Sequence, residues 1–545
     1  MSKLFVFSIG GSGSRVVRAL NMLLASGVPH FKSGDQVFPI MIDYDIANGD
    51  TDRAFKCVET YNNLHNCAYP KDFEKNHETE RRFFHTSLMK MSEIGGGCTS
   101  SFTMQFRHNP NDKTFGDAIG FDKLKGEKAK TMSLLKTLYD TSSGDDTELG
   151  IDMTVGFKGN PNIGSVVFNN LKDTTELKDF FNCCTPDKGD KVILIGSLFG
   201  GTGASGIPEL VKAIRNNAKT KNIHLGVVML MPYFEFDKND EKGAVKSNLF
   251  DSKTRAALSF YESSDVNQKI DSIYYIGDTE RNKIPYSLGG ASQKNKSHLV
   301  DLIGALSVLH FFNSDKKRDP QRYKYRMHDN EEEHEPGFTI LNFYKDDYMK
   351  IIQPLVKIAF VVKFMRSEIA KKTKIVTDRP YSMAFGLPSY FDNHGIVGQP
   401  SSRSREESQN AKYEPGLHST LYNFQLFSDQ FIEWVEELKE IGTHKLVMFD
   451  FERSIDSLVQ DCKLSKKSEG FMGLGAGIEK VLVEPLDFSE QIQKHYANKY
   501  QDAAPVKGNL HFKDTTAGYA LLDCLLIGIE NILRKSEISS ILKFQ

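Results

Sequence analysis

The sequence lacks the features that mark most membrane, secreted and nucleic-acid-binding proteins. Its 545 residues contain no apolar run near the roughly 18 residues that a spanning helix needs, so we expect no membrane span. Neither sign of charge dominates, because 69 Lys and Arg residues stand against 71 Asp and Glu residues. A broad basic surface for nucleic acid or acidic lipid is therefore not indicated.

Cysteines are few and scattered. The seven cysteines are odd in number and include no C-x-x-C pair. A disulfide framework or a zinc site is therefore disfavoured, and reduced thiols are the expectation. The segment MSKLFVFSIGG at the start runs straight into a strand-like stretch and a glycine turn, without a signal-peptide cleavage pattern. These features predict a cytoplasmic protein.

Two common phosphate-binding motifs are also missing. The sequence contains no G-x-x-x-x-G-K-[ST] segment, so a P-loop protein is excluded. The loop IGGSGSR at 9–15 begins like G-x-G-x-x-G, but Val16 stands where the third glycine belongs. The dinucleotide fingerprint therefore fails, which disfavours a Rossmann-type oxidoreductase without removing it as an alternative.

Apolar stretches alternate with helical patterns in the first half of the chain. The strand-like segments are KLFVFSIG, QVFPIMIDYD, KVILIGSL, IHLGVVMLMPYF and IDSIYYIGD. This alternation predicts an α/β fold with a doubly wound, mostly parallel sheet covered by helices on both faces. Ligands of such sheets bind outside the carboxyl ends of the strands.

The length predicts more than one domain. We expect a nucleotide-binding domain at 1–295, interrupted at about 52–150 by a polar insertion with some helix that is not part of the sheet. Residues 296–374 are expected to hold a long central helix, a loop and a following helix. Residues 375–545 are expected to form a smaller α+β domain, with SMAFGLPSYF, KLVMFDFE and VEPLDF as strand candidates.

Four loops contain residues suited to phosphate or Mg²⁺; three follow predicted strands, and the third in order is a glycine turn that leads into a helix. They are IGGSGSR (9–15), MIDYDIANGD (41–50), GFKGNPNIG (156–164) and FGGTGASG (199–206). Glycines let backbone N–H groups approach a phosphate closely, and a helix N-terminus adds its dipole and free donors. Carboxylates such as Asp43 and Asp45 can hold Mg²⁺ directly or through water. Any one of these loops alone is also an ordinary turn between a strand and a helix.

The order of the four loops resembles that of the tubulin/FtsZ superfamily of GTPases. The loop at 199–206 is similar to the G-G-T-G-[ST]-G signature, with Ala204 as a departure, and the loop at 156–164 looks like the third loop of FtsZ. The resemblance covers roughly 1–50 and 150–365 and favours a divergent bacterial or phage member. It implies GTP or GDP and Mg²⁺ as ligands, and a homopolymer assembled head to tail as the partner.

The resemblance also implies roles for individual residues. The first loop would contact phosphate through the backbone of Gly10, Gly11, Ser12 and Gly13, and the fourth loop through that of Gly200, Gly201, Thr202 and Gly203. Ser14, Arg15 and Asp43 would make further contacts to the nucleotide. Asn160 of the third loop would contact ribose or phosphate, and Asn295 at the start of the central helix would contact guanine. Asp45 matches the acid that reaches Mg²⁺.

The stretch PGFTILNFYKDDYMKII at 336–352 corresponds to the loop by which a neighbouring subunit completes the site in this family. Asn342, Asp346 and Asp347 resemble the FtsZ pattern of an Asn followed by two acids, and the spacing makes Asp347 the first candidate to align water on the γ-phosphate. Such positioning suffices for phosphoryl transfer. Alternatively, the two acids only favour the dipole of the following helix.

Two functions remain open at this point. One is a GTPase that assembles into filaments, with hydrolysis completed by the neighbouring subunit. The other is a nucleotide-gated scaffold or switch with little hydrolysis, which acts through an adaptor or effector protein. The loop at 336–352, whose spacing departs from the FtsZ pattern, and the insertion of about 100 residues would suit the nucleotide-gated scaffold.

Overall fold

A parallel sheet organises the described part of the chain. Its strands are β1 (Lys3–Ile9), β2 (Gln36–Ile42), β3 (Ser87–Leu88), β4 (Lys191–Ser197), β5 (His224–Leu230), β7 (Ser272–Ile276), β9 (Gln321–Arg326) and β10 (Gly337–Thr339). They lie in the order β10-β9-β7-β5-β4-β1-β2-β3, and each neighbouring pair is parallel. The computed structural model describes residues 2–32, 34–45, 47–69, 81–104, 114–124, 126–139, 148–153, 156–237, 247–278, 281–287, 289–326, 337–339, 348–372, 415–440, 491–492, 494–495, 498–499 and 517–535.

The central strands are apolar on both faces because both faces are covered. Along β1, Leu4 and Val6 lie in one hydrophobic core. Phe5 and Phe7 lie in the other core, as expected from the alternation of side chains along a strand. These two cores confirm the predicted α/β fold with a parallel sheet between helical layers.

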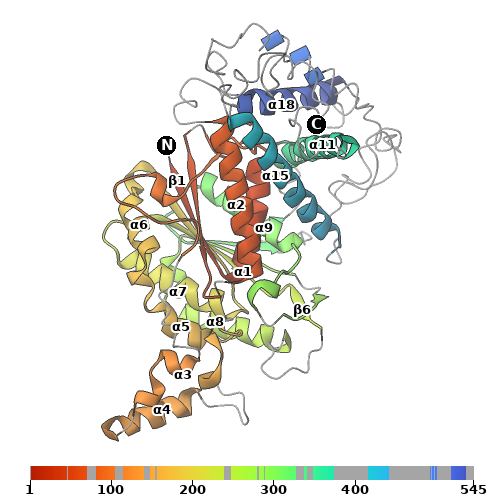
Figure 1. The fold of residues 1–545 in the computed structure, drawn as a ribbon. Helices are drawn as coiled ribbons and strands as arrows, with labels where there is room; N and C mark the ends of the chain where they lie inside the picture. The colour runs from red at the N-terminus through yellow and green to blue at the C-terminus, as the bar shows by residue number, and fades with distance from the viewer. Residues whose placement is uncertain are drawn as a thin grey trace, which may run out of the picture.

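Two helical layers enclose the sheet (Figure 1). One layer contains α1 (Gly10–Ala25), α2 (Gly49–Ala68) and α9 (Leu299–Asn313). The other contains α5 (Pro161–Phe168), α6 (Thr175–Cys183), α7 (Gly201–Asn216) and α8 (Phe250–Ser263). Almost every side chain of α9 is buried, because this helix lies between the sheet and further helices.

Three later helices pack outside the first layer. They are α11 (Tyr348–Lys372), α15 (Pro415–Glu440) and α18 (Ala517–Lys535). α15 and α18 contact α2, and α11 contacts α1 (Figure 1). Trp434 of α15 is buried in the same core as α1. The described helices of the expected C-terminal domain therefore share a core with the sheet domain, and its three strand candidates lie outside the described residues.

The expectation that about 52–150 stays outside the sheet is wrong for its first part. α2 belongs to the layer over β1 and β2, and β3 extends the sheet by pairing with β2. The error has a physical cause: α2 buries polar side chains such as Asn62 and His65, so its apolar periodicity is weak. Farther along, α3 (Phe115–Ala118) and α4 (Ala129–Tyr139) project away from the sheet (Figure 1).

The helices of the described segments include none that is long and apolar enough to cross a membrane. The helices on both sides of the sheet bury their apolar residues against it or against one another, which accounts for their hydrophobic content.

His65 illustrates how the polar interior of α2 affects stability. Its Nδ1 lies 2.8 Å from the carbonyl oxygen of Phe84, and its ring is 5% exposed. Burial lowers the pKa of His65 from 6.5 to about 4. Between these two pH values the unfolded chain binds a proton that the folded chain does not, so stability falls as the pH falls through this window.

We expect His65→Asn to weaken this acid sensitivity, because an amide can still donate to the Phe84 carbonyl but cannot take up a proton. Urea denaturation at several pH values between 6.5 and 4.5 should show the wild type losing up to about 1.4 kcal/mol per pH unit relative to the variant. Parallel pH profiles for the two proteins would contradict a neutral, buried His65.

Candidate functional site

A cleft lies where β1, β2 and β4 end. It encloses about 870 Å³, counting the space open to solvent. The order β2-β1-β4 places a topological switch point between β1 and β4, because the chain leaves these strands toward opposite sides of the sheet. The cleft is therefore at the position where open parallel sheets bind ligands.

Most of the residues predicted from the sequence border this cleft. Those that line it are Gly10, Gly11, Ser12, Arg15, Asp43, Asp45, Gly200, Gly201, Thr202, Gly203 and Asn295. Gly13, Ser14 and Asn160 are not among the lining residues of the described chain. Asn342, Asp346 and Asp347 lie outside the described residues, so the structure does not place them.

Two helices, α1 and α7, begin at the cleft and α5 begins next to it, and none of the three has a capping side chain among the described residues. α1 starts after Ile9, α5 after Asn160 and α7 after Gly200, and none of these three positions makes a side-chain cap. By contrast, the Asn48 side chain caps α2 by accepting from two backbone N–H groups. Uncapped helix N-termini present free N–H groups and the positive end of the helix dipole. The cleft is thus suited to an anion such as a phosphate.

Glycines bring the first, third and fourth loops into contact. Gly10 has φ +77°, and a Cβ there would lie 3.3 Å from the Cβ of Thr202. A Cβ on Gly201 would lie 2.9 Å from the Cβ of Phe157 and 3.0 Å from the backbone nitrogen of Asn160. Side chains larger than hydrogen would therefore push these loops apart. Asn160 is adjacent to the cleft through this contact.

Two further glycines serve packing between helices and strands. A Cβ on Gly13 would lie 2.7 Å from the carbonyl oxygen of Ile195, and one on Gly203 would lie 2.4 Å from that of Ser197. α1 and α7 can therefore lie directly against β4. Ser14 is turned inward, with its Oγ 3.1 Å from the Oγ1 of Thr51.

Two carboxylates follow β2 at the edge of the cleft. Burial and the nearby charge of Asp45 raise the pKa of Asp43 to about 8. Burial also raises the pKa of Asp45, although its oxygens accept from the backbone N–H groups of Ala47 at 3.1 Å and Gly290 at 2.6 Å. The described residues contain no group of three or more His, Cys, Asp or Glu side chains that could hold a metal ion. Mg²⁺ bound together with a nucleotide needs only one or two carboxylates, so this pair suits that role.

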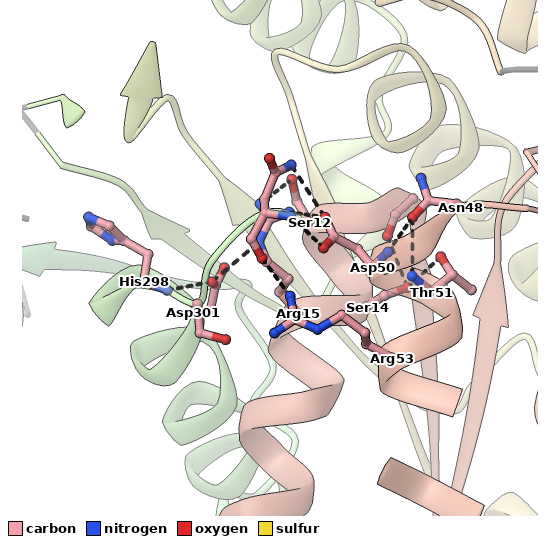
Figure 2. A network of polar contacts seen from close by, with 12 residues as sticks. Ser12, Ser14, Arg15, Asn48, Asp50, Thr51, Arg53, His298 and Asp301 are labelled. Carbon is pink, nitrogen blue, oxygen red and sulfur yellow. Dashed lines mark hydrogen bonds and ion pairs between the residues drawn. The ribbon is translucent and has the colours of Figure 1, made fainter. Parts of the chain in front are cut away.

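Arg15 is the centre of a buried polar network (Figure 2). Its guanidinium lies 2.6 Å from Asp50 and 3.4 Å from Asp301, and it donates to the Tyr233 hydroxyl at 2.6 Å. Burial opposes its charge, but these partners outweigh burial and raise the pKa of Arg15. Arg15 borders the cleft, but its charge is already paired with Asp50 and Asp301. We therefore infer that Arg15 positions the starts of the helices.

Asp50 also fixes the residue predicted to contact guanine. It accepts from the backbone nitrogen of Asn295 at 2.9 Å and from the Asn295 side chain at 3.3 Å. Burial raises the pKa of Asp50 to about 6, against the opposing charges of Arg15 and Arg53. The Asn295 amide nitrogen is thus engaged, while the residue still lines the cleft.

Sequence reasoning missed an aromatic wall of the cleft. Its members come from the loop after β4, the short strand β6 (Phe234–Phe236), the start of α8 and the segment before the central helix: Phe199, Phe234, Phe236, Phe250 and Tyr286. Phe157 also lines the cleft, but its ring packs against Tyr44 and Phe168. The rings of Phe236 and Tyr286 lie 5.2 Å apart and nearly perpendicular. The alternation in the segment YFEF could have signalled part of this wall, but Phe250 and Tyr286 carry no local pattern.

No protein-family model matches the sequence, and no curated protein is significantly similar to it. The strand order β3-β2-β1-β4-β5-β7 also occurs in doubly wound domains that bind dinucleotides. The topology therefore locates a ligand site without identifying the ligand, and the argument for a function depends on the cleft itself.

We expect Gly13→Ala to lower the free energy of unfolding by about 1–3 kcal/mol, because the new methyl group would overlap the Ile195 carbonyl. Gly11→Ala is the matched control: its Cβ would lie 3.3 Å from the Asp50 carboxylate, with no backbone atom among its nearest neighbours. Urea denaturation of both variants makes the comparison. An equal effect of the two substitutions would count against the packing role of Gly13.

Proposed function

We propose that this chain binds GTP or GDP with Mg²⁺ in the cleft and assembles head to tail into filaments as a tubulin/FtsZ-like GTPase. The observation that supports this most is the convergence of the uncapped N-termini of α1 and α7 at the β1/β4 switch point. Such an arrangement favours a ligand with several negative charges on neighbouring groups, as in a nucleoside triphosphate.

In this proposal the glycine loops at the starts of α1 and α7 bind the phosphates through backbone N–H groups. Gly10, Gly11 and Gly201 line the cleft and carry no Cβ that could block such an approach, and Thr202 lines the cleft as well. Asp45 and Asp43 are the carboxylates available to Mg²⁺, which would neutralise charge on the phosphates. A nearby cation would also favour the ionised form of Asp43, whose pKa is otherwise raised by burial.

The aromatic wall gives the nucleoside a place in the same cleft. Phe234, Phe236 and Tyr286 offer ring faces and edges to a purine, while Asn295 lines the cleft beside them. A phosphate-binding side and an aromatic side within one cleft favour a nucleotide over inorganic phosphate. The guanine preference itself rests on the resemblance of the sequence motifs.

Hydrolysis is assigned to the neighbouring subunit. Asp347 would align water on the γ-phosphate, with Asp346 and Asn342 beside it, and the site would be complete only in an assembled filament. This part of the proposal rests on the sequence pattern alone.

A nucleotide-gated scaffold is the second candidate. The projecting helix α4 has no buried residue, and its Leu134 and Leu138 are 58% and 56% exposed. An exposed apolar helix favours contact with an adaptor or effector protein. In that case nucleotide binding would control a partner, and turnover would be slow.

The test is GTP turnover per subunit as protein concentration rises, with light scattering followed in the same sample. The proposal predicts that turnover and scattering appear together above a threshold concentration. Asp347→Ala should keep the filaments and lose turnover by at least tenfold, whereas Asp346→Ala, the matched control, should lose less.

Other outcomes distinguish the alternatives. GTP binding without scattering and with turnover that stays flat would favour the nucleotide-gated scaffold. Binding of NAD(P) in place of GTP would favour a Rossmann-type oxidoreductase and contradict the GTPase proposal.

A further inference from the structure

Two cysteines far apart in the sequence lie side by side, away from the cleft. Cys98 follows the glycine run in the loop after Met91–Glu93, and Cys183 is the last residue of α6. Their sulfur atoms are 2.8 Å apart. This separation is within an ångström of a disulfide bond length of about 2.05 Å. Among the described residues both are free thiols.

The approach of the two sulfurs is fixed by groups other than the thiols. Asp179 of α6 accepts hydrogen bonds at 2.9 Å from the backbone nitrogens of Thr99 and Ser100, and it also accepts from the Ser100 hydroxyl. Asp179 is 6% exposed, so these bonds are largely shielded from water. The loop is therefore held on the end of α6 at the residues that directly follow Cys98.

The chain before Cys98 can adjust to a bond. Gly95, Gly96 and Gly97 have φ values of +84°, +70° and +85°, and a Cβ at any of them would meet nothing within 4 Å. Glycine tolerates such values and changes of them at little cost. Cys98 can thus move the short remaining distance without displacing the core around Cys183.

We propose that Cys98 and Cys183 form a reversible disulfide in the folded protein when the surrounding glutathione pool is oxidised. This inference does not depend on the proposed GTPase function. It adds to the sequence-based expectation of reduced thiols, because spacing along the chain does not show that residues 85 positions apart meet. Disulfides of this kind in reducing compartments are typically transient.

The reaction balances as two thiol–disulfide exchanges. The partly exposed Cys98 attacks one sulfur of oxidised glutathione and releases one molecule of glutathione. The buried Cys183 sulfur then attacks the Cys98 sulfur, and its proton leaves with the second glutathione. Two protein thiols and one oxidised glutathione become one protein disulfide and two reduced glutathiones. Burial raises the pKa of Cys183, which lowers the fraction of its thiolate available for the second exchange.

The bond would join two segments that lead to the cleft. The residues after Cys98 continue the sheet, since the Met41 backbone nitrogen donates to the Phe102 carbonyl at 2.7 Å, two residues before Asp43. On the other side, the Lys3 ammonium donates to the Cys183 carbonyl at 2.7 Å. Oxidation would therefore fasten the β2 edge of the sheet to α6 near the start of β1.

The test incubates the full chain with glutathione mixtures from fully reduced to fully oxidised, traps free thiols with an alkylating reagent, and digests with trypsin. The proposal predicts loss of two of the seven thiols and a linked pair of peptides, residues 91–107 with 179–188. Dithiothreitol should restore both thiols, and oxidation should raise the melting temperature by roughly 5 °C.

Serine variants resolve which sulfur takes part, because Cys183 and Cys184 share one peptide. Cys184→Ser is the matched control and should still lose two thiols. Cys98→Ser should lose none, whereas Cys183→Ser should lose one, because its Cys98 stays as the mixed disulfide with glutathione. A Cys183–Cys184 bond, a bond between chains, or full alkylation of wild-type Cys98 in oxidised glutathione would overturn the proposal. The thiol count on the wild type decides the matter even where a variant fails to fold.

Discussion

The cleft depends on one buried cation. Arg15 is 3% exposed, and it lies between Asp50 at the start of α2 and Asp301 at the start of α9. Removing three charged groups from water is costly, and only close, well-paired geometry offsets that cost. Loss of one partner would leave an uncompensated buried charge, which typically costs about 3–5 kcal/mol. The starts of α1, α2 and α9 are consequently held at a fixed separation beneath the ligand cleft.

Two acids of the second loop, Asp45 and Asp50, also hold the segment that precedes α9. Asp45 accepts from the Gly290 nitrogen, and Asp50 accepts from the Asn295 nitrogen, so one loop anchors both ends of the segment before α9. A cation on Asp45 would share this carboxylate with Gly290 and would bear on the same segment. A cation bound there would therefore be physically linked to the position of Asn295 and to the Arg15 network, which would give the proposed nucleotide a route to affect α9.

The strands of the sheet could be predicted from the sequence, because they follow from local apolar runs. The apolar runs correspond to β1, β2, β4, β5 and β7, and the glycine loops after β1 and β4 do lie at strand ends around one cleft. The sequence did not reveal α2 and β3 as parts of the layered domain, because their stability depends on distant polar pairs. The Asn62 side chain donates to the Leu88 carbonyl, and the Tyr61 hydroxyl donates to that of Thr86 at 2.8 Å. Such pairs leave no period in the sequence.

The net charge of the chain likewise says little about what the cleft can bind. A formal net charge of −2 argues against a broad basic surface but says nothing about a phosphate bound by backbone dipoles. In this cleft the groups suited to an anion are the backbone N–H groups at the uncapped starts of α1 and α7, with α5 beginning next to them. Those starts can converge because Gly13 and Gly203 let two of the helices lie directly on β4. The glycines of one loop therefore have separate tasks, some facing the cleft and others packing behind it. Only the contacts of each residue distinguish these tasks, since the letters of the motif are the same.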